Sequence, residues 1–504
     1  MSTDPAASGG KLPALSYSFA KRHGALVSGV EEGGGLRVHH RPDLRLSVLL
    51  ELRRRFRREL RLTELAPADF EAMLRRTFEA GSSQAMEEME SLDDTLDLEQ
   101  AAEQIGEPRD LAESADDAPI IRLINALVTE AVKKGASDIH LEPYEDRLSV
   151  RFRVDGVLRK VLEPRRALAP LIASRVKVMA RLDIAEKRLP QDGRISLRIA
   201  GRPVDVRVST LPTGHGERVV MRLLDKQAGR LSLEDLGMVP AMRDTLDRLI
   251  HRPNGIILVT GPTGSGKTTT LYAVLRRLNE TSRNIMTVED PIEYDLEGIG
   301  QTHVNTKVDL TFARGLRAIL RQDPDIVMVG EIRDVETARI AVQASLTGHM
   351  VLSTLHTNSA IGAMARLKDM GVEPYLLSSS LAAVLAQRLV RLLCEHCKQP
   401  RSVSHQEWDD LAIAGGPWSA CPERLYRPKG CDACLGSGFA GRGGIYELVP
   451  IDDTLKGLIH DSAGERELTA HARTFSSSLR DDGLRLLHTG RTTLEEILRV
   501  TRDD

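Results

Sequence analysis

One octapeptide constrains the fold of this chain more than any other feature. Residues 261–268 read GPTGSGKT and directly follow the apolar run GIILVT at residues 255–260. The pattern predicts a strand, a glycine-rich turn whose backbone N–H groups point at phosphate oxygens, and a helix through Leu271, Leu275 and Leu278 whose positive N-terminus faces the same anion. The sequence therefore predicts a P-loop, because a glycine-rich turn without a ligand would not need the complete motif and both flanks.

Each part of the octapeptide has an expected role in nucleotide binding. Gly264 and Gly266 lack the Cβ that would block the close approach of a phosphate. Lys267 can reach the β- and γ-phosphates, and the hydroxyl of Thr268 can bind Mg²⁺. The residues expected to contact ATP are Gly261, Pro262, Thr263, Gly264, Ser265, Gly266, Lys267, Thr268 and Thr269.

The size and charge of the chain limit the classes of protein to which it can belong. Its 504 residues exceed what one hydrophobic core can organise, so three or four domains are expected. The 69 basic and 72 acidic residues give a formal net charge of -3, so the overall charge does not favour a nucleic-acid partner. Any charged partner must be recognised locally.

No apolar run is suited to span a membrane. The best candidate, residues 381–393, is shorter than the roughly 18 to 20 residues of a transmembrane helix and is interrupted by Gln387, Arg388 and Arg391. The polar N-terminus lacks the apolar core of a secretory signal. We therefore expect a cytoplasmic protein that associates with a membrane only through a partner.

Residues 1–82 read as a small mixed domain. Residues 35–40 form a possible strand, and helical periodicity runs from Leu46 to Leu60. A cluster of arginines lies in the second half of this segment and just after it. Such a cluster is more often a solvated helix face than a site for an acidic partner or anionic lipid headgroups. These residues are Arg53, Arg54, Arg55, Arg57, Arg58 and Arg61.

Three further parts follow along the chain. Residues 83–118 contain thirteen acidic residues and the single basic residue Arg109 between Glu87 and Asp117, which predicts a flexible acidic linker. Residues 119–230 begin with a helical pattern and continue with alternating runs, which predicts a separate α/β domain. Residues 231–504 alternate strand and helix patterns, which predicts a largely parallel sheet, and become helical and charged from Glu447.

A second apolar run, residues 325–330, ends at Glu331. Many P-loop enzymes place an aspartate of the Mg²⁺ shell at this point, so here the glutamate is expected to hold the metal or its water. In the alternative interpretation, Glu331 is an acid near the N-terminus of a helix from Ile332 to Ala344, where the helix dipole would stabilise it.

A crowded group of carboxylates follows a predicted strand at residues 284–288. Glu289, Asp290 and Glu293 would repel one another unless cations hold them. Such crowding is expected beside Mg²⁺ or beside a water that is activated for in-line attack on the γ-phosphate. Glu289 or Asp290 could instead be a turn acid before a proline, so Glu293 is the residue expected to orient the water.

A third polar strand end lies in residues 348–358, which read GHMVLSTLHTN. His356 could report the γ-phosphate to the rest of the sheet. A histidine at a strand end is more often a structural residue, so the motif carries the argument rather than the histidine itself.

Two C-x-x-C pairs predict a metal site. Cys394 and Cys397 are separated by thirty-three residues from Cys431 and Cys434. Four thiolates in this pattern form the closed, structural type of Zn²⁺ site, which leaves no open position for catalysis. The pattern fits a reducing compartment better than a disulfide framework, and the fifth cysteine, Cys421, is expected to be a bystander.

The order and spacing of four segments resemble the secretion ATPase superfamily of type II secretion and type IV pili. These segments are the P-loop, TVEDPIEY, QDPDIVMVGEIRD and GHMVLSTLHTN, and the resemblance is strong over residues 118–450. Residues 15–24, LSYSFAKRHG, resemble the general secretory pathway protein E family of type II secretion ATPases. The resemblance implies an α/β fold with a RecA-like P-loop ATPase domain, a smaller α/β domain before it, a small N-terminal mixed domain and a zinc-binding subdomain at residues 391–445.

The resemblance also implies a homohexamer in which ATP lies between the P-loop domain and the preceding α/β domain. Arg207 and Arg222 match arginines that this family supplies to the phosphates, and Arg321 and Arg333 are further candidates. A planar guanidinium suits the charge that develops on a transferring phosphoryl group. Arginines on alternating strands are, however, often salt-bridged instead.

The resulting hypothesis is a cytoplasmic hexameric ATPase, peripherally associated with the inner membrane, that hydrolyses ATP with Mg²⁺ to power pseudopilus assembly and protein export. The implied partners are the cytoplasmic domain of a membrane-anchored L-type component, bound by residues 1–82, and an F-type inner-membrane platform protein. The expected catalytic residues are Lys267, Glu293, Glu331, Arg207, Arg222 and His356.

Three alternatives remain open from the sequence. A type IV pilus extension ATPase would share the catalytic segments, whereas a retraction ATPase is not expected to have the cysteine pairs and the N-terminal extension. A zinc-containing nucleic-acid translocase is disfavoured by an aromatic content of only 3%, and no nucleic acid is expected as a partner. A scaffold that binds ATP without turnover would tolerate the loss of Lys267.

Overall fold

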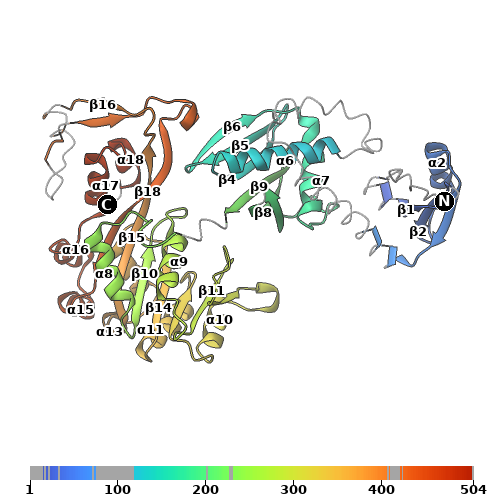
Figure 1. Ribbon diagram of the computed structural model, residues 1–504. Helices are drawn as coiled ribbons and strands as arrows, with labels where there is room; N and C mark the ends of the chain where they lie inside the picture. The colour runs from blue at the N-terminus through green and yellow to red at the C-terminus, as the bar shows by residue number, and fades with distance from the viewer. Residues whose placement is uncertain are drawn as a thin grey trace, which may run out of the picture. The chain divides into compact units, whose positions relative to one another are not determined.

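The structure is a computed structural model, and it divides into two compact units, residues 1–225 and residues 226–504 (Figure 1). The residues that it describes are 15, 19–20, 23–31, 34–67, 69–70, 73–74, 118–199, 202–225, 231–403, 405, 408, 420–422 and 424–501. The predicted acidic linker at residues 83–118 lies outside this part of the chain, except for its last residue.

The first unit begins with a three-stranded sheet and a helix. Its elements are β1 (Ala25–Val30), β2 (Leu36–His40), α2 (Leu46–Phe56) and β3 (Leu60–Glu64). β2 pairs antiparallel with β1 and parallel with β3. The predicted strand is confirmed, but the helix predicted as far as Leu60 is too long. Arg57 adopts a left-handed backbone conformation with a φ of 49°, which ends the helix before Leu60 begins a strand.

Residues 118–225 form an antiparallel sheet with helices on one face. The elements are α6 (Ala118–Lys133), β4 (Ala136–Pro143), β5 (Leu148–Val154), β6 (Val157–Leu162), α7 (Ala169–Met179), β7 (Gln191–Ile199), β8 (Arg202–Thr213) and β9 (Gly216–Asp225). The strand order is β6-β5-β4-β9-β8-β7. Alternate residues of the strands pack with α6 and α7 in one apolar core, which leaves the opposite face to charged side chains.

The second unit is built on a seven-stranded sheet. Its first elements are α8 (Pro240–Ile250), β10 (Gly255–Thr260), α9 (Lys267–Leu278), β11 (Ile285–Glu289), β12 (Gly300–His303), α10 (Phe312–Ile319), β13 (Ile326–Val329), α11 (Val335–Leu346), β14 (Met350–Leu355), α12 (Ala360–Asp369), α13 (Pro374–Ser380), β15 (Leu381–Leu393) and β18 (Phe439–Pro450). The strand order is β12-β11-β13-β14-β10-β15-β18. All neighbouring pairs are parallel except β15 with β18, so the predicted largely parallel sheet is confirmed.

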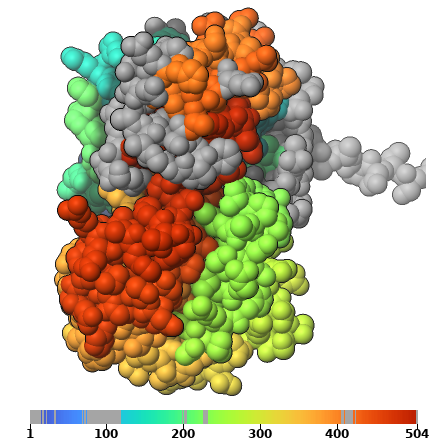
Figure 2. All heavy atoms as spheres, turned by 90° about the vertical axis from the view of Figure 1, so that its left-hand side faces the viewer, coloured from blue at the N-terminus to red at the C-terminus, as the bar shows by residue number. Residues whose placement is uncertain are grey.

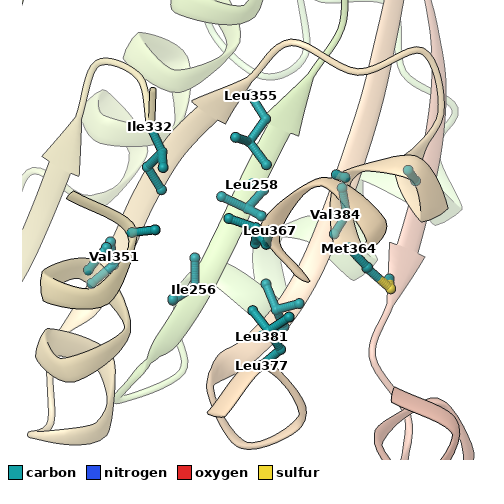
Figure 3. Packing of buried hydrophobic residues seen from close by; sticks show 14 of the residues in the cluster. Ile256, Leu258, Ile332, Val351, Leu355, Met364, Leu367, Leu377, Leu381 and Val384 are labelled. Atoms are coloured by element: carbon teal, nitrogen blue, oxygen red, sulfur yellow. The ribbon is translucent and has the colours of Figure 1, made fainter. Parts of the chain in front are cut away.

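The P-loop strand lies in the middle of this sheet and is covered on both faces. Such strands are apolar along their whole length, and every residue of β10 is buried. On one face, Ile256 and Leu258 lie beside Leu367 of α12 (Figure 3). On the other face, Ile257 shares a core with Leu271 of α9. The packing therefore holds strand and helix together and fixes the ends of the turn between them.

The chain ends in a group of helices. They are α15 (Asp453–His460), α16 (Glu465–Ala472), α17 (Leu479–His488) and α18 (Leu494–Val500). The C-terminal residues, red in Figure 2, lie beside the green segment that contains α8. The helical region begins at Asp453 rather than at the predicted Glu447, because β18 continues to Pro450. None of the described helices is both long and apolar enough to cross a membrane.

A buried carboxylate attaches α18 to β15. Glu496 is only 4% exposed and forms ion pairs with Arg391 and, at 2.9 Å, with Arg499. Burial alone would raise the pKa of Glu496, but hydrogen bonds from these two arginines lower it to about 2. A carboxyl with a depressed pKa stabilises the folded state above its unfolded pKa, and this stability is lost as the pH falls toward the folded value.

We expect Glu496→Gln to lower the free energy of unfolding at pH 7 by about 3 kcal/mol, the equivalent of the pKa difference. The variant should also lose less stability than the wild type as the pH falls from 4.5 to 3, because it lacks the titrating group. Urea denaturation at several pH values measures both effects. Glu495→Gln, at the exposed neighbouring position, is the matched control. If the free energy of unfolding of Glu496→Gln fell with pH as steeply as that of the wild type, Glu496 would not be the titrating group.

Candidate nucleotide-binding and metal sites

Three glycines of the P-loop have backbone conformations that other residues rarely adopt. Gly261, Gly264 and Gly266 have φ angles of 151°, 81° and 86°. A Cβ on Gly261 would clash with the carbonyl oxygen of Gln387, and one on Gly266 would lie 2.9 Å from Nε2 of the same residue. The glycines expected to admit a phosphate therefore also let the turn pack closely against β15.

The groups around this turn suit a nucleotide with its Mg²⁺. Lys267 is buried, and its Nζ donates to the carbonyl oxygens of Gly261 and Pro262 at 2.8 and 3.1 Å. Burial lowers the pKa of Lys267 to about 8, so an incoming phosphate would stabilise its charged form. Thr268 is exposed at the start of α9, and the buried Oγ of Ser265 has no hydrogen-bond partner among the described residues. These donors and hydroxyls fit the expected ATP and Mg²⁺.

Two of the predicted polar strand ends meet beside Lys267. Glu331 follows β13 and His356 follows β14, and Nε2 of His356 lies 3.5 Å from Oε2 of Glu331. Partial burial and the charge of Lys267 lower the pKa of His356. The negative charge of Glu331 acts on Lys267 in the opposite direction to burial, and raises the pKa of Lys267. The structure therefore brings Lys267, Glu331 and His356 together. Arg333, a predicted phosphate ligand, forms an ion pair with Glu331.

The alternative interpretation of Glu331 as a helix-terminal acid does not match the structure. The following helix begins at Val335, and its N-cap is Asp334 rather than Glu331. Oδ1 of Asp334 accepts the backbone N–H of Thr337 at 2.7 Å. Glu331 is thus free of a capping role and lies in the group around Lys267.

One of the crowded carboxylates, Glu289, is held by neutral groups rather than by a cation. Glu289 is buried and accepts hydrogen bonds from neutral groups: the hydroxyl of Tyr272, Oγ1 of Thr287 at 2.5 Å and Nε2 of Gln301 at 3.0 Å. The backbone N–H of Glu293 donates to the same Tyr272 hydroxyl at 3.3 Å. Tyr272 thereby connects α9 to the segment that contains Glu293, the residue predicted to orient the water.

Arg207 and Arg222 lie directly opposite each other on β8 and β9, on the polar face of their sheet. Nε of Arg222 donates to Oδ1 of the buried Asp138 at 2.9 Å, and Nη2 of Arg207 lies 4.0 Å from Oδ1 of Asp192. Both arginines thus have carboxylate partners, as expected in the alternative interpretation that they form salt bridges instead of binding phosphate. Their side chains are still 39% and 56% exposed, so they remain accessible to a ligand.

The last arginine candidate has a local contact. Nη1 of Arg321 donates to the backbone carbonyl oxygen of Arg317 at 2.9 Å, at the C-terminal end of α10. This contact satisfies a carbonyl group that the end of a helix leaves free. Its role at the phosphates stays a prediction.

The four cysteines form a cluster with the dimensions of a zinc site. Their sulfur atoms all lie within 4.8 Å of one another, and three of the Sγ–Sγ distances are 3.7, 3.8 and 3.9 Å. A tetrahedral site with Zn–S bonds of about 2.3 Å separates its sulfurs by about 3.8 Å. Backbone N–H groups of Cys431 and Gly438 donate to Sγ of Cys434 at 3.2 and 3.1 Å, as is typical around metal-bound thiolates. Cys394, Cys397, Cys431 and Cys434 therefore fit Zn²⁺.

One aromatic residue and two polar residues of the nucleotide site were not predicted from the sequence. Tyr272 has helical spacing and reads as an ordinary core residue. In the sequence, Gln387 and Arg388 only interrupt an apolar run, yet both are buried beside the P-loop. The available signal was a pair of polar residues in the middle of a strand that is otherwise buried.

Two protein-family models match the chain. A model of the type II/IV secretion system protein family matches residues 113–499. The chain belongs to this family. A second model, which describes an N-terminal domain of GSPII protein E, matches residues 14–78 of this secretion ATPase.

Curated relatives match the secretion ATPase over nearly its whole length. The type II secretion system protein E of Pseudomonas aeruginosa is 60% identical over 99% of this chain and 98% of the relative. The type II secretion system ATPase E of Vibrio cholerae is 57% identical over 97% of each chain. These matches confirm the predicted family and its enzyme class, an ATP hydrolase of type II secretion.

Solved structures confirm the predicted α/β fold. The crystal structure of the pilus retraction motor PilT with bound ADP has a TM-score of 0.52 and 27% identity, over 75% of this chain and 96% of that one. The ATPase DotB of Legionella pneumophila has a TM-score of 0.56 at 20% identity, over 76% and 96% of the two chains, which shows the fold alone.

Proposed function

We propose that the protein works as a homohexamer whose cycles of ATP hydrolysis drive pseudopilus assembly and the export of folded proteins by a type II secretion system. The observation that carries this proposal is the near full-length identity of 60% and 57% to type II secretion proteins E, which includes the N-terminal region. The pilus retraction motor PilT resembles only 75% of the present chain. The type II assignment therefore accounts for more of the chain than a pilus motor does.

The residues around the P-loop would have separate roles in hydrolysis. A bound Mg²⁺ would neutralise phosphate charge during the attack of water. Lys267 and the N-terminus of α9 would hold the phosphates, and the hydroxyl of Thr268 and the carboxylate of Glu331 would hold the metal or its water. Glu293, attached through its backbone to Tyr272, would orient the attacking water.

The arginines give a reason for assembly. By the family resemblance, Arg207 and Arg222 would supply charge to the phosphates in the assembled hexamer. An exposed guanidinium on a rigid strand can supply charge to the transition state. Weak hydrolysis by the isolated chain is therefore expected.

The N-terminal sheet is proposed to dock on the cytoplasmic domain of an L-type membrane component. On its helix α2, Leu46 and Leu50 are 72% and 59% exposed, next to the exposed Arg53. The neighbouring Arg54 pairs with Glu51 at 2.9 Å. An apolar patch edged by positive charge suits a partner surface with apolar and acidic groups. Contact with an F-type platform protein would transmit the motion, and both partners would place the protein at the cytoplasmic side of the inner membrane.

Deletion of the gene in the native host, with complementation by the wild type or by Glu331→Gln, tests the proposal. Enzyme activity secreted into the medium and surface pili are scored in parallel. We expect loss of secretion with pili intact, restored by the wild type but not by Glu331→Gln, because that variant lacks the carboxylate for the metal or its water.

Glu336→Gln, at an exposed position of α11, is the matched control and should restore secretion. Loss of pili with secretion intact would reassign the same chemistry to a pilus extension motor. Full complementation by Glu331→Gln, at equal protein level, would show that turnover does not depend on this carboxylate.

A further inference from the structure

The strand beside the P-loop carries two polar residues within a buried apolar run. β15 pairs parallel with β10, and Thr260 at the end of β10 lies opposite Ala386. The next residues of β15, Gln387 and Arg388, therefore pass beside the turn that begins at Gly261. They are only 2% and 6% exposed. Burial of an amide and a guanidinium costs free energy unless each makes compensating contacts.

Gln387 contacts both ends of the P-loop. Its Oε1 accepts a hydrogen bond from Oγ1 of Thr270, in the first turn of α9, at 2.7 Å. Its backbone carbonyl oxygen and its Nε2 occupy the space that side chains on Gly261 and Gly266 would need. One residue of β15 thus constrains the start of the turn, its end and the helix that follows.

Arg388 connects the same strand to the segment after β14. Its Nη2 donates to the backbone carbonyl oxygen of Asn358 at 2.6 Å, and its Nη1 donates to the carbonyl oxygen of Gln387 at 3.2 Å. Asn358 is two residues beyond His356, which lies beside Glu331. The planar guanidinium therefore bridges two backbone groups that belong to different parts of the nucleotide site.

We propose that Gln387 and Arg388 are positioning residues of the nucleotide site. Gln387 holds the P-loop and α9 in the conformation that receives phosphates, and Arg388 holds the segment of His356 against that loop. This inference rests on the proposed ATPase function and extends it to a strand that carries none of the predicted catalytic residues. The two residues are expected to have separable effects, because every nucleotide would occupy the P-loop, whereas the segment of His356 is predicted to respond to the γ-phosphate.

The role of Gln387 is tested by the binding of a fluorescent ADP analogue to the full-length chain. Gln387→Leu and Thr270→Val each remove one side of the same buried hydrogen bond, and each should weaken binding about tenfold. The double variant should bind no more weakly than the weaker single variant, because only one bond is lost. Thermal unfolding midpoints show that each variant is folded, and Thr270→Val leaves β15 intact if Gln387→Leu fails to fold.

Two results would overturn this part of the inference. One is an ADP affinity equal to that of the wild type in both folded single variants, and the other is an additive loss in the double variant. Failure of the wild type itself to bind ADP would instead overturn the proposed function.

The role of Arg388 is tested by the kinetics of the assembled hexamer. Arg388→Lys keeps the charge but cannot bridge two carbonyl groups, so kcat should fall about tenfold while KM changes less than about threefold. Arg391→Lys is the matched control on the same strand, because Arg391 pairs with Glu496 and stacks on Phe439 instead. It should lower stability and leave kcat unchanged. An equal loss of kcat in both variants would show that only the stability of the strand matters, and would overturn the assignment of Arg388.

Discussion

Lys267→Ala is expected to reduce ATP hydrolysis by the assembled hexamer by roughly a hundredfold to a thousandfold, the usual cost of removing a charged group that stabilises a transition state. The ammonium group is buried in the P-loop, where it donates to two backbone carbonyl oxygens. Alanine cannot supply the ammonium group that would meet the β- and γ-phosphates. Phosphate release from ATP measures the turnover, and binding of a fluorescent nucleotide measures the affinity.

The matched control for this experiment is Lys307→Ala, at an exposed position before α10. It removes the same charge from the chain and should keep the wild-type rate. Normal turnover by a Lys267→Ala hexamer would contradict the assignment of the P-loop as the catalytic site. The scaffold that binds ATP without turnover would instead be indicated if the Lys267→Ala variant lost hydrolysis but still supported secretion in the native host.

Cys434→Ser is expected to abolish metal binding and to unfold the segment around the cysteines. Structural Zn²⁺ sites contribute about 10 to 16 kcal/mol of apparent binding free energy at neutral pH, and this energy holds the surrounding fold together. Sγ of Cys434 also accepts two backbone N–H groups, so its loss removes the centre of the cluster. We expect about one zinc ion per wild-type chain and much less than one in the variant, measured by elemental analysis of purified protein.

Cys421→Ser is the matched control for the metal site. Cys421 lies apart from the cluster and donates to the carbonyl oxygen of Pro422. This variant should keep both its metal content and its thermal unfolding midpoint. A wild-type protein with far less than one zinc ion per chain would contradict the metal assignment.

The sequence was sufficient for the features that depend on local pattern. The strand before the P-loop and the helix after it were predicted because apolar runs and glycines act over a few residues. The cysteine cluster was predicted from spacing alone, since four thiolates in two pairs have few other uses. In both cases the signal lies within segments that are short compared with the chain.

Contacts across the fold could not be predicted in this way. Thr270 and Gln387 are separated by 117 positions, and only the pairing of β10 with β15 brings them together. Glu289 was expected to need a cation because two of its three neutral donors, Tyr272 and Gln301, come from other elements. The end of α2 was missed for a different reason: Arg57 is not a residue type that favours the left-handed conformation it adopts.

The antiparallel pairing of β15 with β18 connects the cysteine cluster to the strand beside the P-loop. The register extends to the pair of Leu393 with Phe439, and Cys394 is the next residue of the chain. Gln387 lies on the same strand about 23 Å from Cys394, at roughly 3.3 Å per residue. The paired strands thus connect the cysteine cluster to the strand beside the P-loop, with one irregularity of register between Arg391 and Leu393. Zn²⁺ bound at the four cysteines would therefore restrain the far end of the strand that carries Gln387.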